Sequence, residues 1–259
     1  MEQKNSLSVV LAVYNEEKNI QACLDAVQDI ADEIIVVDGG STDTTVAIAS
    51  RYTKKVIVTD NPPIFHINKQ KALERATCTW ILQLDADEII TQALKKEILQ
   101  TIEENNGNIV GYYIPRKNYF WGHWMRKGGQ YPDYVIRLVK RGYAAFPCKS
   151  VHEQIAINGS VGWLTEPMIH NSYNSLEEYW KKAESYTTLT AKEMIKSNLH
   201  PSVQAWLTYM IVKPIQTFFT LFLRHKGFFD GIYGLVFAYY SGLHFPIAYR
   251  KFIQMKKEA

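Results

Sequence analysis

Residues 33–43 read Glu-Ile-Ile-Val-Val-Asp-Gly-Gly-Ser-Thr-Asp, an apolar run that ends in an acidic, glycine-rich turn. A short continuous apolar run of this kind predicts a strand that is buried on both faces. The glycines after it allow the backbone to turn sharply and let a ligand approach closely. Because residues 44–52 have helical spacing, the stretch predicts a strand–turn–helix unit with polar groups at the carboxyl end of the strand.

The same unit recurs on both sides of this stretch. Apolar runs alternate with segments of helical periodicity, and the connections between them are short. This order predicts an α/β protein with a doubly wound, mostly parallel sheet, in which ligands bind beyond the carboxyl ends of the strands. The predicted strands cover residues 6–13, 33–37, 55–59 and 79–84, and the predicted helices cover residues 16–26, 44–52, 68–76 and 91–104.

The pattern changes after about residue 108. Residues 109–115 and 134–140 predict strands, and residues 116–132 between them predict a long functional loop, because an inert loop of that length is unusual. A long helix is expected over residues 175–196 with Ser175 as its N-cap, and Pro201 is expected to open another helix.

Residues 85–88, Asp-Ala-Asp-Glu, directly follow the predicted strand at 79–84. Mg²⁺ and Mn²⁺ prefer oxygen ligands such as carboxylates, and a divalent ion stabilises the charge that develops on a diphosphate leaving group. Asp85 and Asp87 therefore predict a metal site, in which one of the two carboxylates binds the metal and the other binds the ribose or sugar. An acidic turn without a ligand is the alternative, because this spacing alone is weakly specific.

Asp38 ends the strand at 33–37, where its carboxylate is suited to accept a hydrogen bond from a base such as uracil. Asp43 stands at the start of the next helix and is a candidate cap. Taken alone, the segment is equally well explained as a plain strand–turn–helix junction.

Four segments in fixed order are much more specific than any one of them. They read AVYNEE (12–17), VDGGSTD (37–43), KQKAL (69–73) and DADE (85–88). Together they resemble the family 2 glycosyltransferases of the GT-A fold, over roughly the first 90 residues.

The resemblance implies a role for each matching residue. Ala12 and Tyr14 would flank the base, Asp38 would read the uracil of a UDP-sugar, and Asp85 and Asp87 would serve ribose, diphosphate and a Mg²⁺ or Mn²⁺ ion. Lys69-Gln70 replaces the commoner Arg-Asn but keeps a positive charge for phosphate. The donor-side residues implied in this way are Ala12, Tyr14, Glu16, Asp38, Lys69, Lys71 and Asp85.

The second half narrows the resemblance. The segments GGQYPDY (128–134), RL (137–138), VHE (151–153) and HNSY (170–173) are similar to a subgroup that contains bacterial lipopolysaccharide-core glucosyltransferases. UDP-glucose is the donor that this subgroup implies, and a lipopolysaccharide-core or other lipid-linked glycan is the acceptor. His170 is a candidate metal or phosphate ligand, with a purely structural histidine as the alternative.

An inverting transfer also needs a carboxylate that takes the proton of the acceptor hydroxyl. Glu153 is the first candidate and Asp133 the second. A surface carboxylate on a loop is the alternative reading of Glu153.

The segment 116–132 contains aromatic and basic side chains that suit an acceptor. Indole rings stack on sugar faces, and basic groups pair with phosphates. A solvated basic loop with two buried indoles is the alternative. The candidate acceptor residues are Arg116, Lys117, Trp121, Trp124, Arg126 and Lys127.

The end of the chain is basic and rich in aromatic residues. Residues 206–259 hold seven Lys or Arg against two acids, a net charge of +5, and 14 of the 33 aromatic residues. The uncharged stretch 231–249 approaches the length of a membrane span, but its Gly, His, Pro and Tyr content favours a helix that lies in an anionic membrane interface. Helices packed on the body or on a second subunit are the alternative.

Composition excludes other classes of protein. The formal net charge of +3 gives no reason to expect nucleic acid as a partner, and the 47% of hydrophobic residues excludes a disordered chain. Cys23, Cys78 and Cys148 form no zinc pattern, and their scattered spacing is typical of reduced thiols in the cytosol. The polar amino-terminal residues 1–6 give no secretory signal. A cytoplasmic enzyme, peripheral on the inner face of a bacterial inner membrane, is therefore expected.

These observations predict a GT-A glycosyltransferase with a helical, membrane-associating extension. We predict a nucleotide-sugar-binding half (residues 1–108), an acceptor-binding half (109–200) and a helical tail (201–259). An enzyme of the same fold that acts on a polyprenyl phosphate or a protein is one alternative, and a nucleotide-sugar-binding protein without turnover is another.

Overall fold

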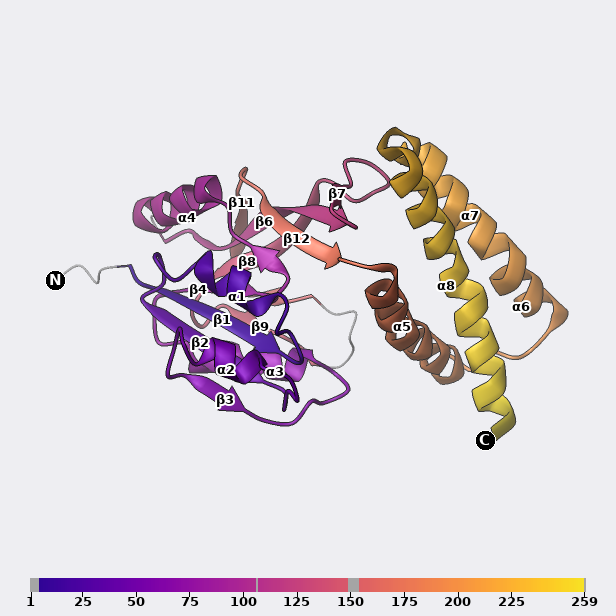
Figure 1. Cartoon of the computed structure of the whole chain (residues 1–259), viewed down its shortest axis with the longest axis horizontal. Helices are drawn as coiled ribbons and strands as arrows, with labels where there is room; N and C mark the ends of the chain where they lie inside the picture. Colours follow the sequence, from indigo (N-terminus) through magenta and orange to yellow (C-terminus); the bar gives the residue numbers. More distant parts are fainter. Residues whose placement is uncertain (1–4, 106, 149–153, 259) are drawn as a thin grey trace. The chain divides into compact units, whose positions relative to one another are not determined.

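The computed structural model describes residues 5–105, 107–148 and 154–258, and it divides the chain into two compact units. The first, which we call the sheet unit, consists of Met1–Arg116 and Tyr134–His170. The second, the helical unit, consists of Lys117–Asp133 and Asn171–Ala259. Figure 1 shows both units, with the sheet in indigo through magenta to salmon and the last helices in brown to yellow.

The sheet unit contains the parallel sheet that the sequence predicts. β1 pairs in parallel with both β2 and β4, and β2 pairs in parallel with β3. The strand order β3-β2-β1-β4-β8-β6-β12-β5 then continues with β8 antiparallel to β4, so the sheet is mixed beyond β4. The first four strands are β1 (Leu7–Val13), β2 (Glu33–Asp38), β3 (Val56–Val58) and β4 (Trp80–Leu84).

The core lies on both faces of this sheet. Side chains that alternate along β1 enter different clusters, with Val9 and Leu11 in one and Val10 in the other, and none of the three is exposed. A period of two is the spacing at which a strand presents residues to opposite faces. Burial of both faces explains why the strand sequences are continuous apolar runs.

The described residues of the sheet unit form four helices: α1 (Ile20–Asp25), α2 (Thr45–Ala49), α3 (His66–Arg75) and α4 (Gln92–Glu104). Thr91 caps α4 by accepting a hydrogen bond from the backbone of Leu94. The first helix begins later than its predicted start at residue 16. The reason is that the backbone N–H of Glu16 donates to Thr45 and the carboxylate of Glu17 accepts from Thr44, so both residues bind the turn before α2.

The segment predicted as a loop over residues 116–132 is partly a β-hairpin. β6 (Ile109–Phe120) continues past the predicted end at residue 115 and pairs with β7 (His123–Trp124). The two residues of the turn, Trp121 and Gly122, have φ values of 52° and 74°. Positive φ at both positions is typical of the turns that match the twist of a hairpin, so the loop prediction was wrong for about its first half, residues 116–124.

The remaining strands complete the sheet unit. β5 pairs antiparallel with β12, and β11 pairs in parallel with β6. Two short strands, β9 and β10, form a separate ribbon. Their bounds are β5 (Glu88–Ile89), β8 (Asp133–Lys140), β9 (Ala144–Ala145), β10 (Ala156–Ile157), β11 (Ser160–Trp163) and β12 (Met168–Tyr173).

The first long helix of the helical unit is α5 (Leu176–Lys196), which Ser175 caps as predicted. The next helix starts at Val203 and not at Pro201, because the side chain of Ser202 accepts from the backbone of Ala205 and forms the N-cap. It continues without a break to Arg224, and then a short turn leads into the last helix. The elements are α6 (Val203–Leu207), η1 (Thr208–Val212), α7 (Lys213–Phe219), η2 (Thr220–Arg224), η3 (Gly227–Asp230) and α8 (Gly231–Glu258).

Glycines let the helices of this unit approach closely. A Cβ atom at Gly242 would lie 2.9 Å from the carbonyl oxygen of Pro214, and one at Gly234 would lie 1.9 Å from that of Gly227. Separations this short leave no room for a side chain. The two helices 203–224 and α8 therefore form a tight hairpin, whose turn lies at residues 225–230.

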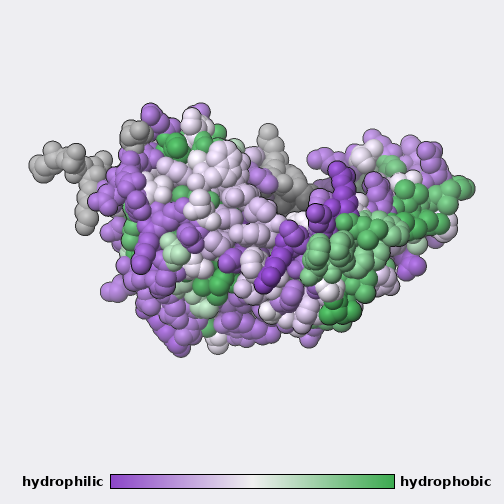
Figure 2. All heavy atoms as spheres, turned by 90° about the horizontal axis from the view of Figure 1, so that it is seen from above, coloured by the Kyte–Doolittle hydropathy of each residue, from purple (hydrophilic) through white to green (hydrophobic). Residues whose placement is uncertain are grey.

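One face of this hairpin is apolar and exposed to solvent. Figure 2 shows hydrophobic residues gathered over the helical unit. Among the described residues, one helix is long and apolar enough to cross a membrane by length and composition: Val203–Arg224, none of whose apolar window is buried. The stretch 231–249, which the sequence singled out, does not meet that criterion. The exposed side chains include Val203, Trp206, Leu207, Ile211, Val212, Ile215, Phe219, Leu223, Phe228, Phe229, Ile232, Leu235 and Tyr239.

Candidate active site

The turn after β2 is built by Asp38. Its carboxylate, which is not exposed, accepts hydrogen bonds from the backbone of Gly40 (2.9 Å) and of Ser41 (2.8 Å), and from the Ser41 hydroxyl. Gly40 has a φ of +79°, a conformation that favours glycine. Asp38 thus stabilises the glycine turn, and its predicted contact with uracil stays a prediction.

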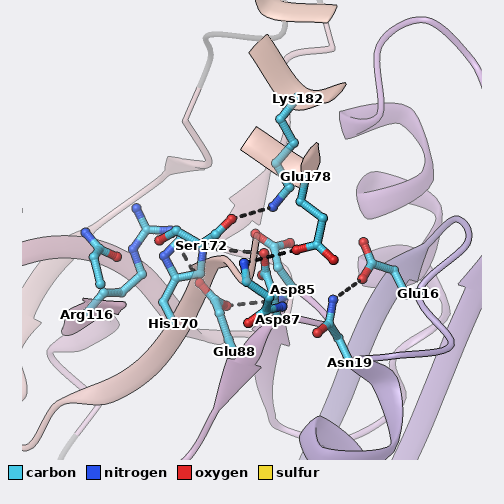
Figure 3. A network of polar contacts seen from close by, with 12 residues as sticks. Glu16, Asn19, Asp85, Asp87, Glu88, Arg116, His170, Ser172, Glu178 and Lys182 are labelled. Carbon is cyan, nitrogen blue, oxygen red and sulfur yellow. Dashed lines mark hydrogen bonds and ion pairs between the residues drawn. The ribbon is translucent and has the colours of Figure 1, made fainter. Parts of the chain in front are cut away.

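The turn after β1 is fastened to the one after β2. Asn15 has a positive φ of 55°, and its side-chain oxygen accepts from the backbone of Thr42 at 2.8 Å. Tyr14, which follows Ala12 and Val13 at the end of β1, has an exposed ring. Glu16 accepts from the amide of Asn19 at 2.8 Å (Figure 3). Of the predicted base-flanking residues, Ala12 therefore lies in the last part of β1 and Tyr14 directly after it, at the carboxyl edge of the sheet.

Asp43 occupies the start of α2, as its position in the sequence indicates. Its carboxylate accepts from the backbone N–H of Thr45 at 2.9 Å and from the Thr45 hydroxyl. A helix cap accepts bonds of this kind. The N-cap position itself is Thr44, so Asp43 binds the first residue of α2 from one position before the cap and is not its N-cap.

An acidic cluster follows β4. Figure 3 shows Asp85, Asp87 and Glu88 close together with His170 and Arg116 beside them. Asp85 binds the Lys69 ammonium at 2.5 Å and the Arg137 guanidinium at 2.7 Å. Burial alone would raise the pKa of Asp85, but the positive charges of Arg137 and Lys69 outweigh it and hold this pKa well below its ordinary value.

Glu88 is the second carboxylate that Arg137 holds. Its side chain is fully buried, and it lies 2.8 Å from the Arg137 guanidinium and 3.4 Å from that of Arg116. Glu88 also accepts from the backbone N–H of Asp85 at 3.0 Å, so it orients the turn that carries Asp85. The cluster thus balances Asp85, Asp87 and Glu88 with three cations: Lys69, Arg116 and Arg137.

Asp87 faces His170. Its Oδ2 atom lies 3.6 Å from the Nε2 atom of His170, and both side chains are largely buried. Pairing between β5 and β12 sets His170 opposite Glu88, which brings this histidine to the cluster from a distant part of the sequence.

The Asp87–His170 pair fits a catalytic metal ion better than a structural one. Among the described residues, no group of three or more His, Cys, Asp or Glu side chains is arranged to enclose an ion. One carboxylate and one imidazole could hold Mg²⁺ or Mn²⁺ only if substrate oxygens or water supplied the remaining ligands, which is how such ions bind to diphosphates. Asp85, held by Lys69 and Arg137, is less available to the ion.

Of the two candidate bases, the structure describes one, Asp133. Glu153 lies outside the described residues. Asp133 begins β8, and its Oδ2 atom accepts from the amide of Asn118 at 3.0 Å. Asn118 is itself buried and donates to the backbone carbonyl of Gln130, also at 3.0 Å, so its side chain orients the Asp133 carboxylate.

The two predicted donor-site lysines have different surroundings. Lys69 is buried beside Asp85. Lys71 instead donates to the Thr59 hydroxyl at 2.9 Å and lies 3.4 Å from Asp60, after the end of β3. Only Lys69 therefore belongs to the acidic cluster as the structure describes it.

Sequence reasoning gave Arg137 and Asn118 no role in the site. Arg137 is the one charge within the apolar run of β8, and this position is the signal that could have found it. It faces Gln83 on β4, to which it also donates a hydrogen bond. Asn118 had no comparable signal, because it directly follows the polar residues Arg116 and Lys117 in the sequence.

Fold and site together define a glycosyltransferase with the GT-A arrangement, in which an acidic turn follows a central strand of a mostly parallel sheet. The sequence signature described as "Glycosyl transferase family 2" matches residues 8–156, which are 149 of the 259 residues. The chain therefore belongs to glycosyl transferase family 2 and is an enzyme, as predicted.

Similarity to known proteins extends over nearly the whole chain. The protein is 29% identical to "Lipopolysaccharide core biosynthesis glycosyltransferase LpsC" of Rhizobium meliloti, over 91% of this chain and 90% of that protein. It is also 29% identical to "Uncharacterized glycosyltransferase RT0209" of Rickettsia typhi, over 90% of this chain and 83% of the relative.

Two solved structures are similar to this chain at low identity. Glucosyl-3-phosphoglycerate synthase from Mycobacterium tuberculosis, solved with Mn²⁺ and UDP-glucose, is 17% identical with a TM-score of 0.46, covering 77% of this chain and 81% of that one. TarS 1-349 from S. aureus, solved with UDP, is 18% identical with a TM-score of 0.49, covering 86% and 74%.

Proposed function

We propose that the enzyme transfers a sugar from a UDP-linked donor to a lipopolysaccharide-core or other lipid-linked glycan, with glucose as the sugar. The observation that carries this proposal is the acidic cluster after β4, in which Asp85 is held by Lys69 and Arg137 while Asp87 faces His170. The acceptor class is supported by the 29% identity to a lipopolysaccharide core glycosyltransferase over nearly the full length of both chains.

On the donor side, each residue of the cluster has a distinct task. Asp87 and His170 would hold a Mg²⁺ or Mn²⁺ ion, which neutralises charge on the diphosphate as the glycosidic bond breaks. Lys69 and Arg137 fix Asp85, which is then available to hydrogen-bond the ribose or sugar. Tyr14 stacks on the base in this proposal.

On the acceptor side, the reaction is a single displacement with inversion. The acceptor hydroxyl attacks the anomeric carbon, its proton passes to a carboxylate, and UDP leaves. Of the two candidate bases, Asp133 has a described orientation, through Asn118. β8 runs antiparallel to β4, so the chain enters β8 at the edge of the sheet where β4 ends. This direction supports Asp133, and Glu153 remains the other candidate.

A lipid-linked acceptor would also explain the exposed apolar face of the helical unit. We propose that the enzyme is cytoplasmic and peripheral on the inner face of the membrane, bound through residues 206–259. Each Lys or Arg close to an anionic surface contributes about 1 kcal/mol to binding, and buried apolar side chains add to it.

The test is UDP release from a panel of UDP-sugars, with and without a lipopolysaccharide-core acceptor. We expect release to require a divalent ion, to stop in EDTA and to return with Mn²⁺ or Mg²⁺. Asp87→Asn should abolish transfer without changing the melting temperature, and Asp60→Asn, an exposed aspartate after β3, is the matched control. Full activity of Asp87→Asn, or of enzyme in EDTA, would exclude the metal role. If UDP release requires a polyprenyl phosphate or a protein as acceptor and not the glycan, the enzyme acts on one of these alternative substrates.

A further inference from the structure

The turn of the helical hairpin is joined to a distant loop of the same unit. The backbone N–H of Gly128 donates to the carbonyl of His225 at 2.9 Å. The Asp230 carboxylate, which is buried, accepts from the backbone N–H groups of Arg126 at 3.0 Å and of Lys127 at 2.8 Å. These three bonds bring residues 126–128 against residues 225–230, about 100 positions further along the chain.

Asp230 holds this junction from the inside. Its carboxylate accepts hydrogen bonds from the backbone N–H groups of Arg126 and Lys127. Both residues are exposed to solvent. His123 lies behind the junction, stacked on Tyr233 with ring centroids 4.3 Å apart and with its Nε2 atom 3.6 Å from Asp230. Backbone hydrogen bonds to the buried Asp230 therefore hold the loop, while Arg126, whose guanidinium lies 4.9 Å from the centroid of the Trp124 ring, and Lys127 stay exposed.

The result is a compact group of exposed cations and apolar side chains, which we call the tip cluster. Arg224, the last residue of η2, and Lys226, in the turn, are exposed. Next to them, Leu223, Phe228 and Phe229 are 52%, 44% and 69% exposed. The tip cluster consists of Arg126, Lys127, Leu223, Arg224, Lys226, Phe228 and Phe229.

Resting on the proposed function, we propose that the tip cluster is the point at which the enzyme binds the anionic headgroups of a membrane, with Phe228 and Phe229 in the interface and Asp230 assembling the cluster. Four cations can bind anionic lipid headgroups, and the exposed aromatic rings between them can enter the membrane interface. Within the described residues 123–130 and 221–232, the one acid is Asp230, which is buried. The membrane contact is then limited to one end of the hairpin and does not involve the whole of residues 206–259. It also includes Arg126 and Lys127, which lie on a loop outside that segment.

The opposite end of α8 provides a matched control. Lys256 and Lys257 lie in the last turn of α8 and carry the same charge as Arg126 and Lys127. At 1.5 Å per residue, they lie about 40 Å along the helix from Asp230. This separation exceeds the Debye length of about 8 Å at physiological salt several-fold, so charges there contribute little to binding at the tip.

The experiment measures co-sedimentation of the full-length protein with vesicles of phosphatidylglycerol and phosphatidylcholine in equal parts, and with vesicles of phosphatidylcholine alone. We expect Arg126→Gln with Lys127→Gln to weaken binding to the anionic vesicles by about 30-fold, from two charges. Phe228→Ser with Phe229→Ser should weaken binding to both kinds of vesicle. Lys256→Gln with Lys257→Gln should leave it unchanged.

Asp230→Asn tests the assembly of the cluster, and its melting temperature is recorded because the residue is buried. A loss of anionic binding like that of the double loop variant is expected. Since Arg126 and Lys127 are exposed, their variant keeps the inference testable even if Asp230→Asn does not fold.

Three outcomes would overturn the inference. If Lys256→Gln with Lys257→Gln weakens vesicle binding as much as Arg126→Gln with Lys127→Gln, binding depends on the overall charge of the protein and not on the tip cluster. Unchanged binding of both tip variants would remove the tip altogether. If light scattering shows a dimer that Phe228→Ser with Phe229→Ser converts to a monomer, while no variant or wild-type protein sediments with vesicles, the surface binds a second copy. UDP release from wild-type enzyme, measured in parallel, reports separately on the proposed function.

Discussion

Arg137 compensates the negative charge of two carboxylates in the site, the fully buried Glu88 and the partly buried Asp85. Its guanidinium lies 2.7 Å from Asp85 and 2.8 Å from Glu88, and its side chain is only 9% exposed. Burial alone would lower the pKa of Arg137, but Asp85 and Glu88 raise it above its ordinary value, so the group stays charged. A neutral side chain at this position would leave two carboxylates in a poorly solvated place.

We therefore expect Arg137→Met to reduce the free energy of unfolding by about 3–5 kcal/mol, the usual result when one partner of a buried ion pair is removed. Urea unfolding followed by circular dichroism measures this. Lys140→Met, at the other end of the same strand, is the control, and a loss below 1 kcal/mol is expected there because surface charges contribute little. Equal effects of the two changes would show that the buried pairing contributes no stability.

Asp133 is the described carboxylate that could act as the base. Asp133→Asn preserves the shape of the side chain and removes the proton acceptor, so we expect turnover to fall by about 10²–10⁴-fold with UDP binding preserved. Asn118→Ala should retain part of the activity and shift its pH profile, because Asn118 only orients the carboxylate. Turnover and UDP affinity are measured for each variant.

Glu153→Gln is the matching change at the other candidate. If it shows the large loss in turnover and Asp133→Asn does not, the base is Glu153.

At the scale of elements, Glu33 joins the starts of three strands. Its carboxylate accepts from the hydroxyl of Ser8 on β1 and from the backbone of Thr77 before β4, and it pairs with Lys55 before β3. Burial would raise the pKa of Glu33, but the hydrogen bonds from Lys55, Ser8 and Thr77 outweigh it and lower this pKa to about 2.

A pKa that is lower in the folded protein means that the carboxylate form favours folding. The stabilisation from Glu33 is therefore complete above its ordinary pKa of 4.5 and is lost as the pH falls towards about 2. We expect Glu33→Gln to lower the melting temperature at pH 7 and to reduce its fall between pH 4.5 and pH 3. Melting curves of both proteins across this range are the measurement, and parallel acid limbs would contradict the assignment.

The elements differ in how well the sequence predicts them. β1, β2 and β4 are found within one residue of their ends, because strands buried on both faces are continuous apolar runs. The start of α1 is missed by four residues, since Glu16 and Glu17 have helical spacing but bond to the turn before α2. The β6–β7 hairpin is missed because its turn, Trp121-Gly122, is not among the common turn sequences.

At the scale of the whole chain, the order of strands and the position of the acidic turn could be predicted, whereas the partners of that turn could not. Asp85 and Asp87 are visible from their place after an apolar run. Their partners Arg137 and His170 come from β8 and β12, and only the pairing of those strands shows which of their residues face the cluster. The contact between Asp230 and residues 126–127 has no signal in a single sequence.

The last prediction concerns how the whole chain associates with a membrane. Helix 203–224 has the length and apolar composition of a span, with a mean hydropathy of 1.2 in its most apolar window. Yet it forms a hairpin with α8, which carries Arg250 and Lys251 on its second half. Lys251 pairs with Glu184 on α5 and donates to Thr187 and Thr188, so this part of α8 is anchored in a polar setting.

A hairpin in which only one helix is suited to hydrocarbon favours binding at the interface over crossing. We expect the protein to remain with the membrane fraction at low salt, to be released in part by high salt, and to be extracted fully by alkaline carbonate. Charge screening removes the contribution of the basic residues, while the exposed apolar face retains the rest. Fractionation of cells followed by immunoblotting measures all three. Resistance to both salt and carbonate would indicate a spanning helix, and recovery in the soluble fraction at low salt would assign the apolar face to contacts between proteins.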